Sequence, residues 1–118
     1  MPEIIEVEFH CKYLGDFQMS RLVQASLRKY TVPITAFISD VVIIEDRCLG
    51  VSFDHFPHDD AYRIANGGII RTEKIQSARK EGRFWLLETQ DGNYVIASFK
   101  RGLGRASFLK LLESADQF

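Results

Sequence analysis

The sequence has little of what stabilises secreted or membrane-embedded proteins. Among its 118 residues only two are cysteines, Cys11 and Cys48, and they lack the C-x-x-C spacing of redox and zinc motifs. The least interrupted apolar stretch, residues 33–44, is shorter than the roughly 18 residues that span a bilayer. Acidic residues also stand where a secretory signal would be basic and then apolar. We therefore expect a soluble, cytoplasmic protein with reduced thiols and no membrane span.

Sequence motifs for catalysis and for nucleotide binding are missing as well. The chain has no G-x-S-x-G segment, no P-loop and no dinucleotide fingerprint. Cys11 follows His10, but adjacent residues of a strand point to opposite faces, so the two are not expected to act as thiol and base. The sequence therefore favours a non-catalytic binding or regulatory module over an enzyme, with no catalytic residues and no cofactor.

Charge is nearly balanced over the whole chain but unevenly distributed along it. The formal net charge is −1, yet residues 71–110 contain 9 Lys and Arg against 4 Asp and Glu. Residues 1–70 show the opposite bias, with 6 against 10. Such asymmetry indicates either a partner of opposite charge or only a well-solvated surface.

Length and composition predict one globular domain over residues 1–118. Hydrophobic residues make up 46% of the chain, enough for one core, and no repeat or Pro/Gly/Ser-rich linker divides it. Alternating apolar residues predict a first strand at residues 5–9, and helical spacing predicts an early helix within residues 16–30. Residues 35–45 and 48–54 predict a hairpin whose first strand bends near Ser39 and Asp40.

The clearest local signal is a second hairpin over residues 83–99. Two runs of high β propensity flank Asp91-Gly92, which suits a two-residue type I′ turn. In this register one face carries Trp85, Leu87, Tyr94 and Ile96, and the other carries Phe84, Leu86, Val95, Ala97 and Phe99. Because both faces are apolar, a helix, another wall of a rolled sheet or a second subunit must cover the second one. Self-association as a homodimer, or a protein partner, is therefore expected.

The C-terminal segment supplies one cover for the sheet. Phe108, Leu111, Leu112 and Ala115 recur at helical spacing and predict an amphipathic helix that begins near Arg105. The predicted fold class is α+β, with a largely antiparallel sheet of about five to seven strands, an early helix and this C-terminal helix. This order of elements resembles the rolled sheet of pleckstrin-homology-like domains. The early helix departs from that family's strand succession, and no activity is carried over.

A histidine and aspartate cluster at residues 54–60 has the ligand types of a zinc, manganese or iron site. Its weak candidates are His55, His58 and Asp59. The same segment suits the start of a short helix, with Pro57 in the first turn and acidic residues at the positive end. We therefore expect no bound metal, and a metal-dependent hydrolase is the least favoured of three functional classes.

The segment before the last helix is the best candidate for binding an anion. Glycine lets backbone N–H groups turn toward an anion beside the positive end of a helix, and arginine contacts phosphate or carboxylate in bidentate fashion. Arg101, Gly102, Gly104 and Arg105 combine these features. The alternative is a plain connector whose glycines only reverse the chain.

Aromatic and cationic residues also alternate in the basic segment, as they do on surfaces that bind single-stranded nucleic acid. The residues concerned are Phe84, Trp85, Tyr94, Phe99, Arg79, Lys80, Arg83 and Lys100. Such aromatics more often belong to a core, and the near-neutral charge argues against nucleic acid. Recognition of an anionic ligand or nucleic acid through residues 71–110 is therefore the alternative to binding a protein partner.

Overall fold

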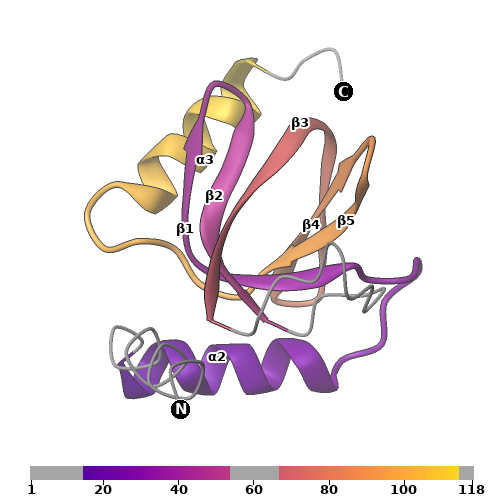
Figure 1. The fold of residues 1–118 in the computed structure, drawn as a ribbon, viewed down its shortest axis with the longest axis vertical. Helices are drawn as coiled ribbons and strands as arrows, with labels where there is room; N and C mark the ends of the chain where they lie inside the picture. The colour runs from indigo at the N-terminus through magenta and orange to yellow at the C-terminus, as the bar shows by residue number, and fades with distance from the viewer. Residues whose placement is uncertain (1–14, 54–66, 115–118) are drawn as a thin grey trace.

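The computed structural model describes residues 15–53 and 67–114 and confirms the α+β class in that part of the chain (Figure 1). In chain order its elements are α2 (Asp16–Leu27), β1 (Ala36–Ile44), β2 (Arg47–Phe53), β3 (Gly68–Glu81), β4 (Phe84–Thr89), β5 (Gly92–Ile96) and α3 (Gly104–Ser114). None of the helices in these ranges is long and apolar enough to cross a membrane. The strand predicted at residues 5–9 lies outside the described residues.

The five strands form a closed barrel. Consecutive strands pair antiparallel from β1 to β5, and β5 then pairs parallel with β1, with Val95 opposite Phe37. Closure leaves no open sheet edge between these strands, which removes a common site of unwanted strand pairing. The pleckstrin-homology-like form that the element order suggested is not confirmed.

Strand β1 bends where the sequence predicted. Its register against β2 shifts between Ser39 and Val42, and Asp40 adopts a φ of 57°. Two residues of β1 thus bulge opposite Gly50 of β2. A Cβ atom on Gly50 would lie 2.6 Å from the Ser39 carbonyl oxygen, so the bulge requires glycine there.

One apolar face of the β4–β5 hairpin points into the barrel, and helix α2 covers the other. The face that carries Leu87 packs inside the barrel against residues of the other strands, such as Ile38 and Ile70, and Phe108 of α3 joins this cluster. The opposite face, which carries Leu86, belongs to a cluster with Leu22 and Ala25 of α2. Figure 1 shows the two helices on different sides of the barrel, with α2 across its lower end and α3 beside the β1–β2 hairpin. The rolled sheet therefore covers the inner face of the hairpin, and the early helix covers the outer one.

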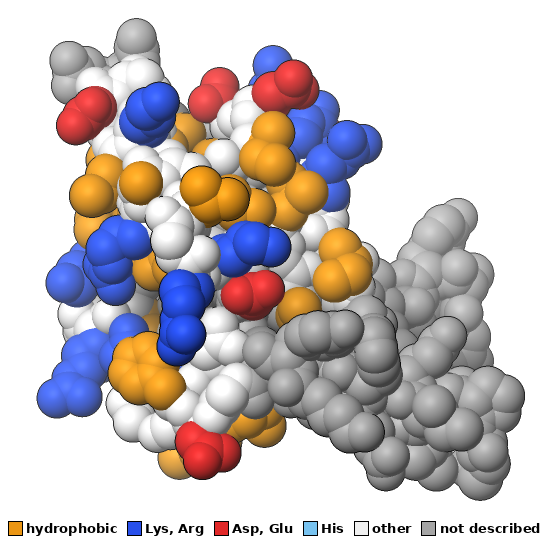
Figure 2. All heavy atoms as spheres, turned by 90° about the vertical axis from the view of Figure 1, so that its left-hand side faces the viewer, with side chains coloured by type: hydrophobic (Ala, Val, Ile, Leu, Met, Phe, Trp, Pro, Cys, Tyr) orange, Lys and Arg blue, Asp and Glu red, His pale blue; other side chains and the backbone are white. Residues whose placement is uncertain are grey.

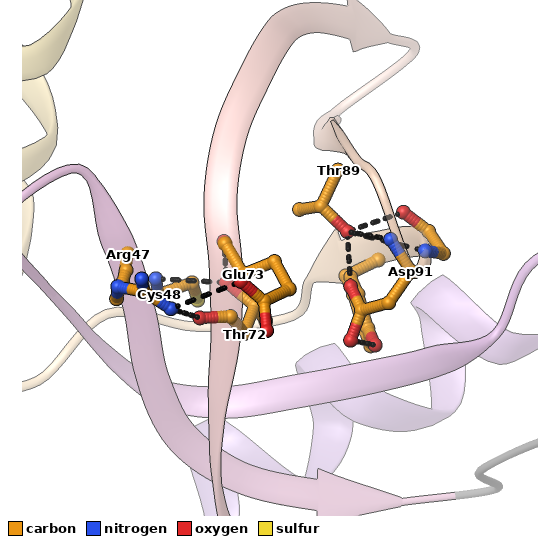
Figure 3. A network of polar contacts seen from close by, with 8 residues as sticks. Arg47, Cys48, Thr72, Glu73, Thr89 and Asp91 are labelled. Atoms are coloured by element: carbon orange, nitrogen blue, oxygen red, sulfur yellow. Dashed lines mark hydrogen bonds and ion pairs between the residues drawn. The ribbon is translucent and has the colours of Figure 1, made fainter.

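The β4–β5 hairpin has the predicted side-chain faces but a different turn, and Leu87 pairs with Tyr94 where a turn at Asp91-Gly92 would pair it with Ile96. Thr89 pairs with Gly92, so Gln90 and Asp91 form the turn, and Gly92 lacks the positive φ expected of a type I′ turn. Thr89 Oγ1 accepts hydrogen bonds from the N–H groups of Asp91 at 3.3 Å and Gly92 at 3.1 Å (Figure 3). Glycine is needed at position 92 for space, because a Cβ atom there would overlap the side chain of Thr35.

Helix α3 begins in close contact with β1. The Gly104 N–H donates to the Lys100 carbonyl at 2.9 Å, and a Cβ atom on Gly104 would overlap the carbonyl oxygen of Val41. One turn later, Ser107 Oγ accepts a hydrogen bond from the Ile43 N–H at 2.8 Å. Gly104 therefore serves helix packing.

Replacing Gly104 by alanine tests this packing role. Alanine favours a helix by about 1 kcal/mol over glycine, but overlap with a fixed backbone carbonyl outweighs that gain. We expect Gly104→Ala to lower the free energy of unfolding by about 2 kcal/mol or more, measured by urea denaturation. Ala106→Ser, on the exposed side of the same turn, is the control and should change it by less than about 0.5 kcal/mol. A stabilised Gly104→Ala variant would contradict the packing argument.

A polar cluster fastens the segment between α2 and β1 to strand β3. The Glu81 carboxylate accepts hydrogen bonds from the Thr31 N–H at 3.1 Å, the Thr31 hydroxyl at 2.5 Å and Arg79 Nε at 2.9 Å. Arg79 also forms an ion pair with Glu88 at 2.7 Å. The hydrogen bonds from Thr31, followed by that from Arg79, lower the pKa of Glu81 to about 2.

Acid should therefore weaken the fold partly through Glu81. Its pKa is lower in the folded chain than the ordinary value of 4.5, so its contribution is complete above pH 4.5 and is lost as the pH falls toward 2. We expect Glu81→Gln to lower the urea midpoint at pH 7 and to differ much less from the wild type near pH 2. The exposed Glu113→Gln should leave the pH 7 midpoint nearly unchanged. An equal deficit of Glu81→Gln at both pH values would contradict this role.

Candidate anion-binding groove

Three segments that are distant in the sequence form a groove of about 630 Å³ on one side of the barrel. They are the first turns of α2, the β3–β4 turn with the strands beside it, and the connection from β5 to α3. The lining residues are Phe17, Arg21, Lys80, Gly82, Arg83, Trp85, Ile96, Ala97, Ser98, Phe99, Lys100, Arg101, Gly102 and Arg105. A volume of this size can accommodate more than a single small ion.

The groove lining is strongly cationic. Six of its residues are lysine or arginine, namely Arg21, Lys80, Arg83, Lys100, Arg101 and Arg105, and no Asp or Glu is among the described residues that line it. Figure 2 views the side of the molecule on which the β5–α3 connection lies. Over the middle and lower part of this face, Lys and Arg side chains stand beside hydrophobic ones, with single acidic side chains among them.

Two of these arginines lie over aromatic rings. The guanidinium carbon of Arg21 is 4.4 Å from the centroid of the Phe84 ring, and that of Arg105 is 4.8 Å from the Phe99 ring. Arg21 Nη2 also donates to the Arg83 carbonyl at 3.4 Å. Cation–π contacts restrict where the guanidinium groups can lie, so these arginines are partly oriented before any ligand arrives.

The gathered cations repel one another. Burial and then the nearby charges of Arg83 and Arg105 lower the pKa of Arg21. Like charges close to one another destabilise the fold unless a counter-ion neutralises them. Electrostatically, the groove therefore favours a negatively charged occupant.

Aromatic side chains lie among the cations of the groove. Trp85 and Phe99 are partly exposed in the lining, whereas Phe84 and Tyr94, grouped with them in the sequence pattern, are buried at 4% and 1% exposure. Phe99 follows the end of β5 and packs with the Trp85 side of the hairpin, not with the predicted Phe84 side. Phe17, which is 73% exposed on α2, also lines the groove and was not among the residues predicted from the sequence.

The predicted anion loop contributes three of its four residues to the groove. Arg101, Gly102 and Arg105 line it, and Gly102 has a φ of 86°. Gly104 does not line it, since this residue is buried and its N–H donates to Lys100. Within the described ranges, neither Arg101 nor Arg105 forms an ion pair.

The other sequence candidates lie elsewhere. Arg79 is ion-paired with Glu81 and Glu88 and does not line the groove. The weak metal candidates His55, His58 and Asp59 fall outside the described residues. Across residues 15–53 and 67–114, no group of three or more His, Cys, Asp or Glu side chains could hold a metal ion.

Cysteine chemistry is not supported at Cys48. This residue is fully buried, and burial raises the pKa of its thiol, which disfavours the reactive thiolate. Its N–H donates to Thr72 Oγ1 at 3.1 Å within strand pair β2–β3 (Figure 3). Cys48 is thus a core residue, and Cys11 lies outside the described residues.

A second hollow of about 740 Å³ lies between the β1–β2 hairpin and α3. Apolar side chains dominate its lining, which includes Ile43, Leu103 and Leu111. The charged residues beside them are of both signs, with Glu45, Asp46 and Lys110. This hollow therefore shows no charge preference comparable to that of the cationic groove.

Comparisons with protein-family models, with curated proteins and with solved structures found no match to the chain. Function is therefore inferred from the chemistry of the groove.

Charge repulsion in the groove makes a stability prediction. We expect Arg83→Gln to raise the free energy of unfolding by about 0.3–0.5 kcal/mol at low ionic strength, because it removes a like charge near Arg21. In 0.5 M salt the gain should largely disappear, because exposed charges are screened. Arg71→Gln, an exposed position outside the groove, is the matched control and should show no such gain. Loss of stability in Arg83→Gln at low salt would contradict the repulsion.

Proposed function

We propose that this protein is a non-catalytic binding module that holds a phosphate-rich anionic ligand in the cationic groove. The observation that carries the proposal is the assembly of six lysines and arginines, with no acidic residue, from three separate segments. The chain as a whole has a net charge of −1, so the concentration of positive charge is local. Clefts lined by one sign of charge focus the electrostatic field and attract oppositely charged ligands.

The composition of the lining supports binding more than catalysis. General acid–base catalysis needs a group that exchanges a proton near neutral pH, and covalent catalysis needs an activated nucleophile. The described residues that line the groove include no His, Cys, Asp or Glu, and the Ser98 hydroxyl belongs to a buried residue. What the groove offers is charge, hydrogen-bond donors and aromatic surface.

Phosphate groups suit these donors better than isolated carboxylates do. Guanidinium groups contact phosphate oxygens in bidentate fashion, and four of the six cations are arginines. The charges come from α2, from the β3–β4 turn and from the β5–α3 connection, so a ligand must be extended to meet them all. A polymer or oligomer of phosphates meets this requirement.

Self-association or a protein partner, which the sequence also predicts, stays a prediction. The apolar hairpin faces that suggested it contain Phe84 and Leu86, which are covered by α2, and Leu87 and Tyr94, which are buried inside the barrel. The proposed function needs only one copy of the chain. A cytoplasmic location likewise stays a prediction.

Removing the loop arginines tests the proposal. We expect the wild type to bind inorganic polyphosphate at low ionic strength, and the double variant Arg101→Ala, Arg105→Ala to bind at least about tenfold more weakly. Isothermal titration calorimetry at two salt concentrations measures both affinities. Because the two side chains are exposed, the unfolding temperature should hardly change.

The matched control removes the same charge from another part of the surface. Lys29→Ala, Arg71→Ala changes two exposed cations that do not line the groove, and it should bind polyphosphate within about twofold of the wild type. Two results would contradict the proposal. One is a wild type that binds no anionic polymer, and the other is an equal loss of affinity in both double variants.

A further inference from the structure

We infer that the ligand of the groove is single-stranded nucleic acid, recognised through its phosphates and through the faces of its bases. This inference rests on the proposed function and adds the aromatic side chains to it. Phe17, Trp85 and Phe99 line the same groove as the six cations. Proteins that bind single strands combine a cationic groove with aromatic rings on which bases stack.

Among the described residues, Phe17 belongs to neither of the two core clusters. It lies on the first turn of α2 with 73% of its surface exposed, while the packing residues of the same helix are Met19, Leu22 and Ala25. Single exposed apolar side chains are common on protein surfaces, but Phe17 stands among the cations of the groove, where a flat apolar group of a ligand can cover it. A nucleic-acid base is such a group, since every base has a π face.

The rings of Trp85 and Phe99 are both supported by the buried ring of Phe108. The Trp85 ring packs edge-on against Phe108 with centroids 4.9 Å apart, and the Phe99 ring lies 5.5 Å from the same residue. Phe108 itself is 1% exposed within the core. Rings supported in this way lose little conformational freedom when a base contacts them, which favours affinity.

The arginines over rings also suit base contacts. Arg105 lies over Phe99 and Arg21 over Phe84, and a planar guanidinium group can stack on a base while its N–H groups reach phosphate. The groove thus places phosphate donors and stacking surfaces side by side. Single-stranded nucleic acid likewise carries phosphates and unstacked bases side by side along its length.

Other phosphate-bearing ligands use less of this arrangement. Inorganic polyphosphate has no planar apolar group for Phe17 or Trp85. In a duplex the base faces are stacked on one another, so rings in a groove cannot reach them. An anionic membrane presents a broad surface to a protein, whereas these cations and rings line a concave groove.

Binding of labelled oligonucleotides tests the inference on the full chain. Fluorescence anisotropy should show a 12-nucleotide single strand bound at least about tenfold more tightly than the duplex of the same sequence at equal salt and equal phosphate concentration. Trp85 is the only tryptophan, so its fluorescence reports contact with the groove directly. It should be quenched by the single strand and much less by polyphosphate.

The aromatic variants separate stacking from charge. Phe17→Ala should weaken single-strand binding about tenfold and leave polyphosphate binding unchanged, because a lost base–ring stack affects only the nucleic acid. Leu27→Ala is the matched control, since Leu27 is 79% exposed on the same helix but does not line the groove. It should bind both probes as the wild type does.

The possible failures are distinguishable. If polyphosphate binds but the single strand binds no better than the duplex, or Trp85 is not quenched, the inference is overturned and the proposed function stands. Tighter binding to anionic phospholipid vesicles than to the single strand would overturn it in favour of a membrane ligand. An equal loss of both probes in Phe17→Ala would also overturn it. If neither polyphosphate nor oligonucleotide binds, the proposed function itself fails.

Discussion

The backbone of Val41 attaches the connection between β5 and α3 to the barrel. Its N–H donates to the Ser98 carbonyl at 3.0 Å, and its carbonyl accepts the N–H of Lys100 at 2.9 Å. Both groups can face this connection because β1 bulges at Asp40 and Val41 and locally leaves its ladder with β2. The same carbonyl sets how closely Gly104 can approach. The bulge in β1 thus positions the β5–α3 connection, which forms one wall of the groove, and the start of α3.

Positioning that wall brings together charges that do not stabilise one another. Arg105 comes from α3 and Arg83 from the β3–β4 turn, and the positive charges of both repel that of Arg21 on α2. Elsewhere the protein pairs its charges, as in the contacts of Arg79 with Glu81 and Glu88. A local cost in stability is common at sites kept for binding, because groups that receive a ligand are unsatisfied without it.

Local pattern in the sequence was sufficient for several elements. Helical spacing located α2 and α3, and alternation located β4 and β5 with Trp85 and Ile96 on one face, because side-chain direction follows the period of each element. The long strand β3 was not singled out. It pairs with β2 over its first part and with β4 over its second, and a register shift between Ile75 and Ser77 breaks its alternation. The turn after Thr89 was predicted at Asp91-Gly92 but lies at Gln90-Asp91. Glycine at position 92 makes room for the side chain of Thr35 and does not form a type I′ turn.

The sequence by itself determined the fold class, the helices, the main hairpin and a basic C-terminal half, because these depend on composition and on contacts between near neighbours. Arg101, Gly102 and Arg105 were also predicted as binding residues from the sequence, since they lie within one short segment. Only the tertiary structure decided that Phe17 and Arg21, from the acidic half of the chain, join them in one groove. Barrel closure and the packing of α2 bring these segments together, and such long-range contacts leave no periodic trace in either segment.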